Sequence, residues 1–146
     1  MENTLCRISG TTMQNLVFTN GCFDIFHAGH LRLLKYAKSL GGILIVGINS
    51  DDSIKRIKGD DRPIISQNDR LNLLKELRCV DHVEIFDEDT PERLLREVCP
   101  DILVKGPEAK NAPIPGADFV KSYGGEVIVP DWPVEISTTR ILELMR

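Results

Sequence analysis

The sequence lacks several features that would place it in a specialised class. No apolar run approaches the roughly 20 residues needed to cross a bilayer, so we expect no transmembrane helix. The first twelve residues contain no apolar core of a secretory signal. There are only four cysteines and no C-x-x-C pair, which excludes a disulfide scaffold. The chain also has no internal repeat and no low-complexity tract, which excludes collagen-like and disordered proteins.

What is present is typical of one globular domain. The chain has 146 residues, of which 42% are hydrophobic and 27% charged. Its 18 basic and 22 acidic residues give a net charge of -4, which argues against a nucleic-acid partner. The same balance still allows a basic pocket for a small anion.

Apolar segments of strand length alternate with segments of helical periodicity. We expect strands at residues 16–19, 43–48, 82–86, 102–105 and 126–129. We expect helices at 31–40, 69–77, 91–98, 117–123 and 137–145, with caps at Ser66, Thr90 and Ser137 or Thr138. This order predicts an α/β fold with a doubly wound, mainly parallel sheet of five strands. Ligands bind such sheets at the carboxyl ends of the strands, which here lead into residues 20–30, 49–62, 105–116 and 131–140.

The segment after the first strand has the features of a phosphate site. His27 and His30 lie three residues apart where a loop becomes a helix, so both imidazoles can face one ligand. Gly29 between them lets an anion approach the backbone, and the helix N-terminus offers free N–H groups. Two other interpretations stay open: zinc ligands together with Cys22, or ordinary surface histidines. The segment is neither a Walker A loop nor a dinucleotide fingerprint.

The segment after the second strand is basic, with Lys55, Arg56, Lys58 and Arg62. Such clusters are usually solvated loops. Because this one follows a strand at the expected ligand edge, we favour a phosphate-binding flap that hinges at Lys58–Gly59.

Two motifs together resemble a known family. Residues 27–30 resemble the H-x-G-H signature of cytidylyltransferase-like nucleotidyltransferases, and residues 136–140 resemble their I-S-T-T-[KR] signature. Further segments resemble the adenylyltransferase domain of bacterial ADP-heptose synthases, which acts on D-glycero-β-D-manno-heptose 1-phosphate. These segments are Asn49-Ser50-Asp51, Lys58-Gly59, Arg62-Pro63, Arg70 and residues 103–106. The resemblance covers residues 16–144.

The resemblance implies a single Rossmann-like domain over residues 1–146, with residues 1–14 as an N-terminal extension. It implies transfer of a nucleoside monophosphate from ATP to the sugar 1-phosphate by direct in-line attack, with release of pyrophosphate. Mg²⁺ accompanying the triphosphate, a homodimer, a cytoplasmic location and a separate sugar kinase in the same pathway are also expected. The alternatives are a CTP-dependent cytidylyltransferase for glycerol 3-phosphate or a related phospho-alcohol, and a nucleotide-binding module without turnover.

The resemblance also assigns site residues, with no metal ligand among them. Catalytic roles fall to His27, His30 and Lys58. Nucleotide or phosphate binding falls to Cys22, Phe23, Gly29, Arg62, Arg70, Lys105, Gly106, Ser137, Thr138 and Thr139. Substrate binding falls to Asp24, Asn49, Asp51 and Glu108.

Some of these assignments have alternatives. Asp24 could instead orient His27 or cap the loop, and Arg70 could be a helix-surface residue. The sequence departs from the family at Pro107-Glu108-Ala109, where related enzymes have G-D-Y, and Glu108 there stands in for the aspartate. Trp132 is either core packing or a wall of the nucleotide pocket.

Overall fold

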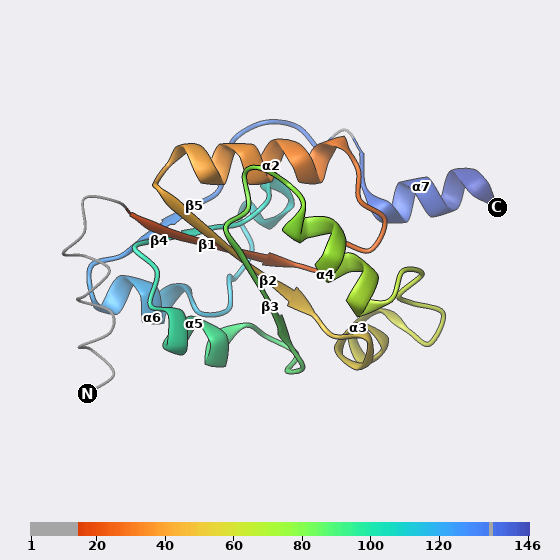
Figure 1. Ribbon diagram of the computed structural model, residues 1–146, viewed down its shortest axis with the longest axis horizontal. Helices are drawn as coiled ribbons and strands as arrows, with labels where there is room; N and C mark the ends of the chain where they lie inside the picture. Colours follow the sequence, from red (N-terminus) through yellow and green to blue (C-terminus); the bar gives the residue numbers. More distant parts are fainter. Residues whose placement is uncertain (1–14, 135) are drawn as a thin grey trace.

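A five-stranded sheet forms the centre of the computed structural model, which describes residues 15–134 and 136–146 (Figure 1). The strand order is β3-β2-β1-β4-β5, and every neighbouring pair is parallel. The strands are β1 Leu16–Gly21, β2 Ile43–Asn49, β3 His82–Phe86, β4 Ile102–Val104 and β5 Glu126–Ile128. The predicted α/β fold with a parallel five-stranded sheet is confirmed. The expected N-terminal extension, residues 1–14, lies outside the described residues.

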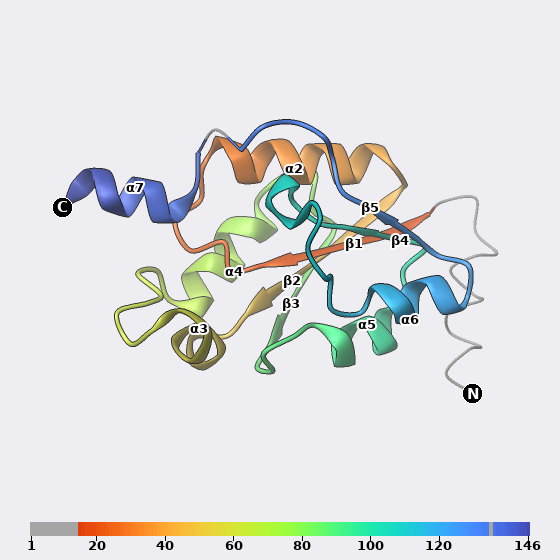
Figure 2. The ribbon, with the colours of Figure 1, turned by 180° about the vertical axis from the view of Figure 1, so that it is seen from behind.

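Helices cover both faces of the sheet, because alternate residues along each strand are apolar toward opposite sides. Val17 and Val46 pack on one face against Leu34 of one helix and Leu74 of another. Phe18 and its neighbours pack on the other face against the remaining pair of helices (Figure 2). The helices are α2 Ala28–Ser39 and α4 Gln67–Lys75 on the first face, and α5 Glu92–Val98 and α6 Ala117–Ser122 on the second.

The basic segment after β2 is a helix and not the loop that we expected. Helix α3, Asp51–Lys58, begins at the N-cap Ser50, whose hydroxyl accepts from the N–H of Ser53. It ends at Gly59, which has a φ of 109°. The predicted flap is wrong in this respect, because a capped helix holds Lys55 and Lys58 in place.

Three predicted helix caps can be compared with the structure. Ser66 caps α4 and Ser137 caps α7, Thr138–Met145, as expected. Thr90 does not cap α5, because Pro91 occupies the N-cap position and makes no side-chain cap bond.

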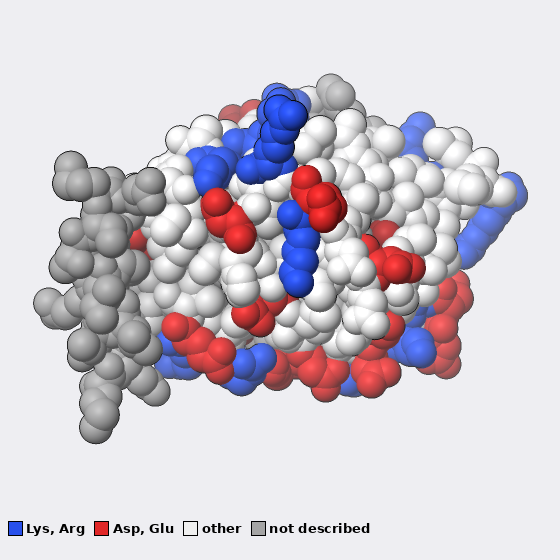
Figure 3. Space-filling view, viewed as in Figure 1, with Lys and Arg blue, Asp and Glu red and all other residues white. Residues whose placement is uncertain are grey.

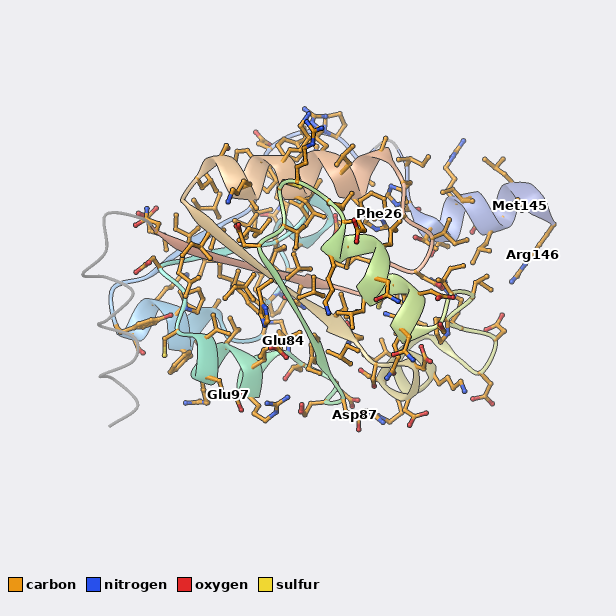
Figure 4. All side chains as sticks on the ribbon, in the orientation of Figure 1. Phe26, Glu84, Asp87, Glu97, Met145 and Arg146 are labelled. Atoms are coloured by element: carbon orange, nitrogen blue, oxygen red, sulfur yellow. The ribbon has the colours of Figure 1, made fainter. Side chains whose placement is uncertain are left out.

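The strand order creates one switch point, between β1 and β4, where the chain leaves neighbouring strands toward opposite faces. From β1 it enters α2, and from β4 it enters the short 3₁₀ helix η1, Pro107–Ala109. Helix α7 extends away from the body, and Met145 and Arg146 lie at its far end (Figure 4). Acidic and basic side chains intermix on the face shown in Figure 3. Within the described residues, no helix is long and apolar enough to span a membrane.

Candidate active site

A cleft of about 580 Å³ opens at the carboxyl ends of the strands, where the switch point predicts a ligand. Segments that follow all five strands contribute to it. The lining includes fifteen of the predicted site residues: Cys22, Phe23, Asp24, His27, Gly29, His30, Asn49, Lys58, Arg62, Lys105, Gly106, Glu108, Ser137, Thr138 and Thr139. The structure therefore brings together residues more than 100 positions apart in the sequence.

The two histidines begin helix α2 and cap it. His27 is the N-cap, and its Nδ1 accepts the N–H of Gly29 at 3.1 Å. The Nδ1 of His30 accepts the N–H of His27 at 3.3 Å, which completes a reciprocal capping box. Both Nδ1 atoms are thus acceptors, so a neutral ring carries its proton on Nε2. This assignment leaves each imidazole with one N–H donor available to a ligand.

The environment keeps both rings neutral. The imidazoles stack with centroids 3.7 Å apart, and Phe23 packs against His30 with centroids 5.0 Å apart. Burial, with repulsion from Lys58 and from His27 when that ring is protonated, lowers the pKa of His30 to about 3. Burial also lowers the pKa of His27, although the Glu108 carboxylate partly offsets it. At neutral pH the pair therefore presents two N–H donors, and both rings are uncharged.

Gly29 is needed for a reason that the sequence did not reveal. A Cβ at this position would lie 3.0 Å from Cε1 and Nδ1 of His27 and 3.4 Å from Cγ2 of Ile136. We had expected the glycine to admit an anion. In the structure its missing side chain makes room for the capping imidazole and for the segment that leads into α7.

The second motif meets the first at the same cleft. The Ser137 hydroxyl accepts the N–H of Arg140 and caps α7. The Thr138 hydroxyl donates to the carbonyl of Ile25, just before the histidines, at 3.3 Å. The N-termini of α2 and α7 consequently border one cavity, and each helix end favours negative charge there.

Asp24 holds an arginine and a loop in place. Its buried carboxylate accepts the N–H groups of Ile64 and Ile65 and the Nε–H of Arg62, the last at 2.8 Å. Burial opposes ionisation, but these three donors outweigh it and lower the pKa of Asp24. Because its oxygens are occupied, the position of Asp24 favours a structural role over the substrate contact that we had assigned to it.

The Arg62 side chain has a buried nitrogen that lacks a hydrogen-bond partner within the described part of the chain. The side chain is 9% exposed, and Nη2 has no hydrogen-bond partner among the described residues. An orphaned buried donor costs roughly 1–3 kcal/mol, and more when it is charged. Arg62 lines the cleft, as does Lys58 at the end of α3. An anionic ligand would satisfy both groups.

The end of β4 adds a lysine and a carboxylate. Lys105 Nζ donates to Oδ1 of Asn20 at 3.1 Å, and burial lowers the pKa of Lys105 despite the nearby Glu108. The Glu108 carboxylate folds back over Gly106, where a Cβ would lie 2.4 Å from both of its oxygens. Gly106 therefore allows this acidic side chain to lie beside His27 and Lys105.

Arg70 and Asp51 do not line the cleft. Arg70 is 1% exposed and donates to the carbonyls of Cys22, Asn49 and Ile65 and to the Asp51 carboxylate. All of these contacts are internal, so Arg70 ties the ends of β1 and β2 to α4. The position of Arg70 does not support the phosphate contact that we expected from the family.

Cys22, Phe23 and Asn49 line the cleft. Cys22 Sγ lies 3.8 Å from Oδ1 of Asn49, whose amide donates to the Ser53 hydroxyl. Phe23 has a φ of 49°, a left-handed conformation that is strained for a bulky residue. The bond from Arg70 to the Cys22 carbonyl holds this turn.

Sequence reasoning missed Arg32 and left Trp132 undecided, and both line the cleft. Arg32 lies on the second turn of α2, where a charged residue is usually a solvated surface residue. Its Cζ lies 4.2 Å from the centroid of the Trp132 ring. The two residues are 100 positions apart, so no local pattern could have paired them.

The described lining offers few free carboxylates to a metal ion. Among the described residues, no three His, Cys, Asp or Glu side chains could together hold an ion. Of the carboxylates in the lining, Asp24 pairs with Arg62 and Asp89 with Arg56, which leaves Glu108. Mg²⁺ commonly binds to substrate phosphates with one or two carboxylates, and Glu108 could supply one.

Comparisons with known proteins identify the family of the chain. The model of the cytidylyltransferase-like family matches residues 18–144. The chain belongs to this family, and the expected nucleotidyltransferase class is confirmed.

Individual relatives within this family show which proteins the chain resembles. The bifunctional protein HldE of a Nitratiruptor species is 54% identical over 91% of this chain. An HldE protein of Helicobacter pylori is 50% identical over the same share. The matched region spans 28% of either relative. Among solved structures, a lipopolysaccharide core biosynthesis protein from Thermoplasma volcanium is 34% identical, with a TM-score of 0.66 over 80% of this chain and 93% of that one.

Proposed function

We propose that the protein transfers the adenylyl group of ATP to D-glycero-β-D-manno-heptose 1-phosphate and releases pyrophosphate. The observation that carries the proposal is the meeting of the stacked His27–His30 pair and the Ser137–Thr139 helix start at one cleft. The 54% identity to an HldE protein and the 34% identity to a lipopolysaccharide core biosynthesis protein support the heptose branch.

The proposed reaction is a single displacement at phosphorus. An oxygen of the sugar phosphate forms a bond to the α-phosphorus, while the bond from that phosphorus to the bridging oxygen of pyrophosphate breaks. No covalent enzyme intermediate is needed, so catalysis consists of positioning and charge stabilisation. Mg²⁺, when bound with ATP, neutralises charge on the phosphate oxygens.

Each group in the cleft then has a distinct role. The Nε2–H groups of His27 and His30 donate to the phosphate oxygens at the reacting centre, and Lys58 adds a positive charge beside them. Nη2 of Arg62 binds another phosphate oxygen and gains the partner that it lacks. The remaining phosphate contacts come from Lys105, Gly29, Gly106 and the hydroxyls of Ser137, Thr138 and Thr139. Asn49 and Glu108 contact the acceptor, and Cys22 and Phe23 line the cleft beside the nucleotide.

A second candidate is transfer of a cytidylyl group from CTP to glycerol 3-phosphate or a related phospho-alcohol. The description of the matching family as cytidylyltransferase-like favours it. The same cleft chemistry would serve, since the phosphates and the displacement are unchanged.

A pyrophosphate-release assay with Mg²⁺ tests the proposal. It crosses ATP, CTP, GTP and UTP with heptose 1-phosphate, glycerol 3-phosphate and several hexose 1-phosphates, and mass spectrometry identifies the product. We expect release with ATP and heptose 1-phosphate. Release with CTP and glycerol 3-phosphate alone would select the second candidate, and binding of ATP without release from any pair would indicate a binding module.

The same proposal includes several further properties. We infer that residues 1–146 form one nucleotidyltransferase domain, that it forms a homodimer in the cytoplasm, and that a sugar kinase activity supplies the sugar phosphate. Size-exclusion chromatography with light scattering tests the dimer directly.

A further inference from the structure

The segment between β5 and α7 runs along helix α2 (Figures 1 and 2). We call residues 129–134 and Ile136 of this segment the strap. Trp132 of the strap packs edge-on against Tyr36, with ring centroids 5.2 Å apart and planes at 90°. The guanidinium of Arg32 lies over the same indole. Arg32 and Tyr36 are four residues apart on α2, so they form one face that receives Trp132.

The strap also makes contacts on either side of Trp132, at Asp131 and at Ile136. Next to Trp132, Asp131 pairs with Lys110 just beyond η1, with 2.5 Å between Oδ1 and Nζ. Further along, Ile136 approaches the first turn of α2, where Cγ2 lies 3.4 Å from a Cβ built on Gly29. The strap therefore follows α2 from its middle to its N-terminus, and delivers Ser137 to the cleft.

Helix α7 has few packing contacts of its own that would fix its position. None of its described residues is buried, and Leu144 and Met145 are 74% and 76% exposed. A helix without a buried face is not positioned by core packing. The strap and the bond from Thr138 to Ile25 hold the start of α7, and the exposed pair of Arg146 with Asp61 lies at its far end.

We propose that Trp132, clamped between Arg32 and Tyr36, is a positioning residue for the phosphate-binding start of α7. It fixes the strap, and the strap holds the Ser137–Thr139 hydroxyls against the histidine pair. The identity of the ligand as a di- or triphosphate rests on the proposed function. A displacement of about 1 Å at such a site can lower activity by roughly a hundredfold, so a remote anchor can matter.

The test compares Trp132→Leu and Trp132→Phe with a matched control. Phe119 has the same two kinds of contact, with Arg96 over its ring at 4.7 Å and Tyr123 at 5.3 Å, but it lies on the opposite face outside the cleft. We expect Trp132→Leu to raise KM for ATP by about tenfold while Trp132→Phe restores most of the affinity. Phe119→Leu should leave the KM for ATP unchanged. Loss of thermal stability in Trp132→Leu without a change in KM would indicate a merely structural role and overturn the proposal.

A binding measurement separates this inference from the proposed function. Calorimetric titration with inorganic pyrophosphate requires no turnover and no knowledge of the acceptor. We expect Trp132→Leu to weaken pyrophosphate binding by about tenfold relative to wild type and to Phe119→Leu. That result would support the anchor even if no acceptor supported turnover. Equal pyrophosphate affinities in folded wild type and Trp132→Leu would overturn the anchor even if the proposed reaction were demonstrated.

Trp132 is also the sole tryptophan of the chain, which provides a direct signal in the wild-type protein. Pyrophosphate or ATP that orders the start of α7 should change its emission, because the indole lines the cleft. A saturable change with the calorimetric Kd is expected. An emission spectrum that stays constant through saturation would contradict coupling between Trp132 and the phosphate site.

Discussion

Replacing Asp24 with asparagine isolates the buried ion pair that orders the cleft. The carboxylate is 2% exposed and accepts Nε–H of Arg62 together with two backbone N–H groups. Asparagine keeps the shape but removes the charge, and its amide group replaces one acceptor with a donor. Breaking one partner of a buried pair costs about 3–5 kcal/mol, because the other charge stays buried without compensation.

This cost should be visible in unfolding. A protein of this size loses roughly 3 °C in Tm per kcal/mol, so we expect a Tm about 10–15 °C lower for Asp24→Asn. Urea unfolding followed by circular dichroism gives the free energy directly. Removing both partners, as in Asp24→Asn with Arg62→Met, should cost less than the sum of the single changes by more than about 1 kcal/mol. The exposed pair of Arg93 with Glu97 provides a control, and Glu97→Gln should change stability by less than about 0.5 kcal/mol.

The pH dependence provides an independent check. The pKa of Asp24 is lowered in the folded state, so the unfolded chain takes up its proton first as the pH falls. The contribution of Asp24 is present above the ordinary aspartate pKa and is lost as the pH falls through the lower folded value. The difference between wild type and Asp24→Asn should shrink in that window. A difference below about 1 kcal/mol at pH 7 would refute the reasoning.

Three further predictions concern the histidine pair and the start of α7. Gly29→Ala should lower turnover about tenfold and Tm by about 3 °C, because its Cβ displaces the His27 ring that caps α2; unchanged pyrophosphate release would contradict this. His30 should show no imidazole titration by NMR between about pH 5 and 8, and a midpoint near 6.5 would contradict its burial. Because its folded pKa of about 3 is below the unfolded value, His30 should reduce stability as the pH falls from about 6.5 toward 3. Ser137→Ala should weaken the α7 cap by about 1 kcal/mol and speed amide exchange there, whereas the Tm hardly changes because α7 has no buried residue; unchanged exchange would argue against the cap.

The sheet was predictable because its signals are local. Residues 43–48 form a continuous apolar run, and the strand at His82–Phe86 has the predicted bounds. Ser66 and Ser137 were recognisable caps. The two signature motifs identified the cleft because the carboxyl ends of parallel strands meet at one edge.

Helix α3 was missed although its signals were present. Ser50 precedes two acidic residues, and basic residues end the helix before Gly59, which is the charge order that a helix favours. Only Ile54 and Ile57 are apolar in the eight residues, so their helical i, i+3 spacing is a short signal beside the many charges. Charge density led to the prediction of a loop.

Long-range pairs had no local signal at all. Asp24 and Arg62 are 38 positions apart, and Arg70 bonds to carbonyls 21 and 48 positions away. Family resemblance assigned Arg70 to phosphate, and in the structure its hydrogen bonds go to internal groups. Tertiary packing turns Arg70 inward and leaves Arg62 at the cleft. The local sequence around each arginine does not distinguish the two cases.

The change His27→Asn tests the central claim that neutral imidazole Nε2–H groups stabilise the reacting phosphates. Asparagine is a strong N-cap, and its side-chain oxygen can accept the Gly29 N–H in place of Nδ1. Its shorter amide places no N–H at the position of Nε2–H. We predict an unfolding free energy within about 0.5 kcal/mol of wild type and pyrophosphate release slower by about 10²–10³, the effect of losing one such donor. Turnover within about threefold of wild type, in a protein that is equally stable, would contradict the account.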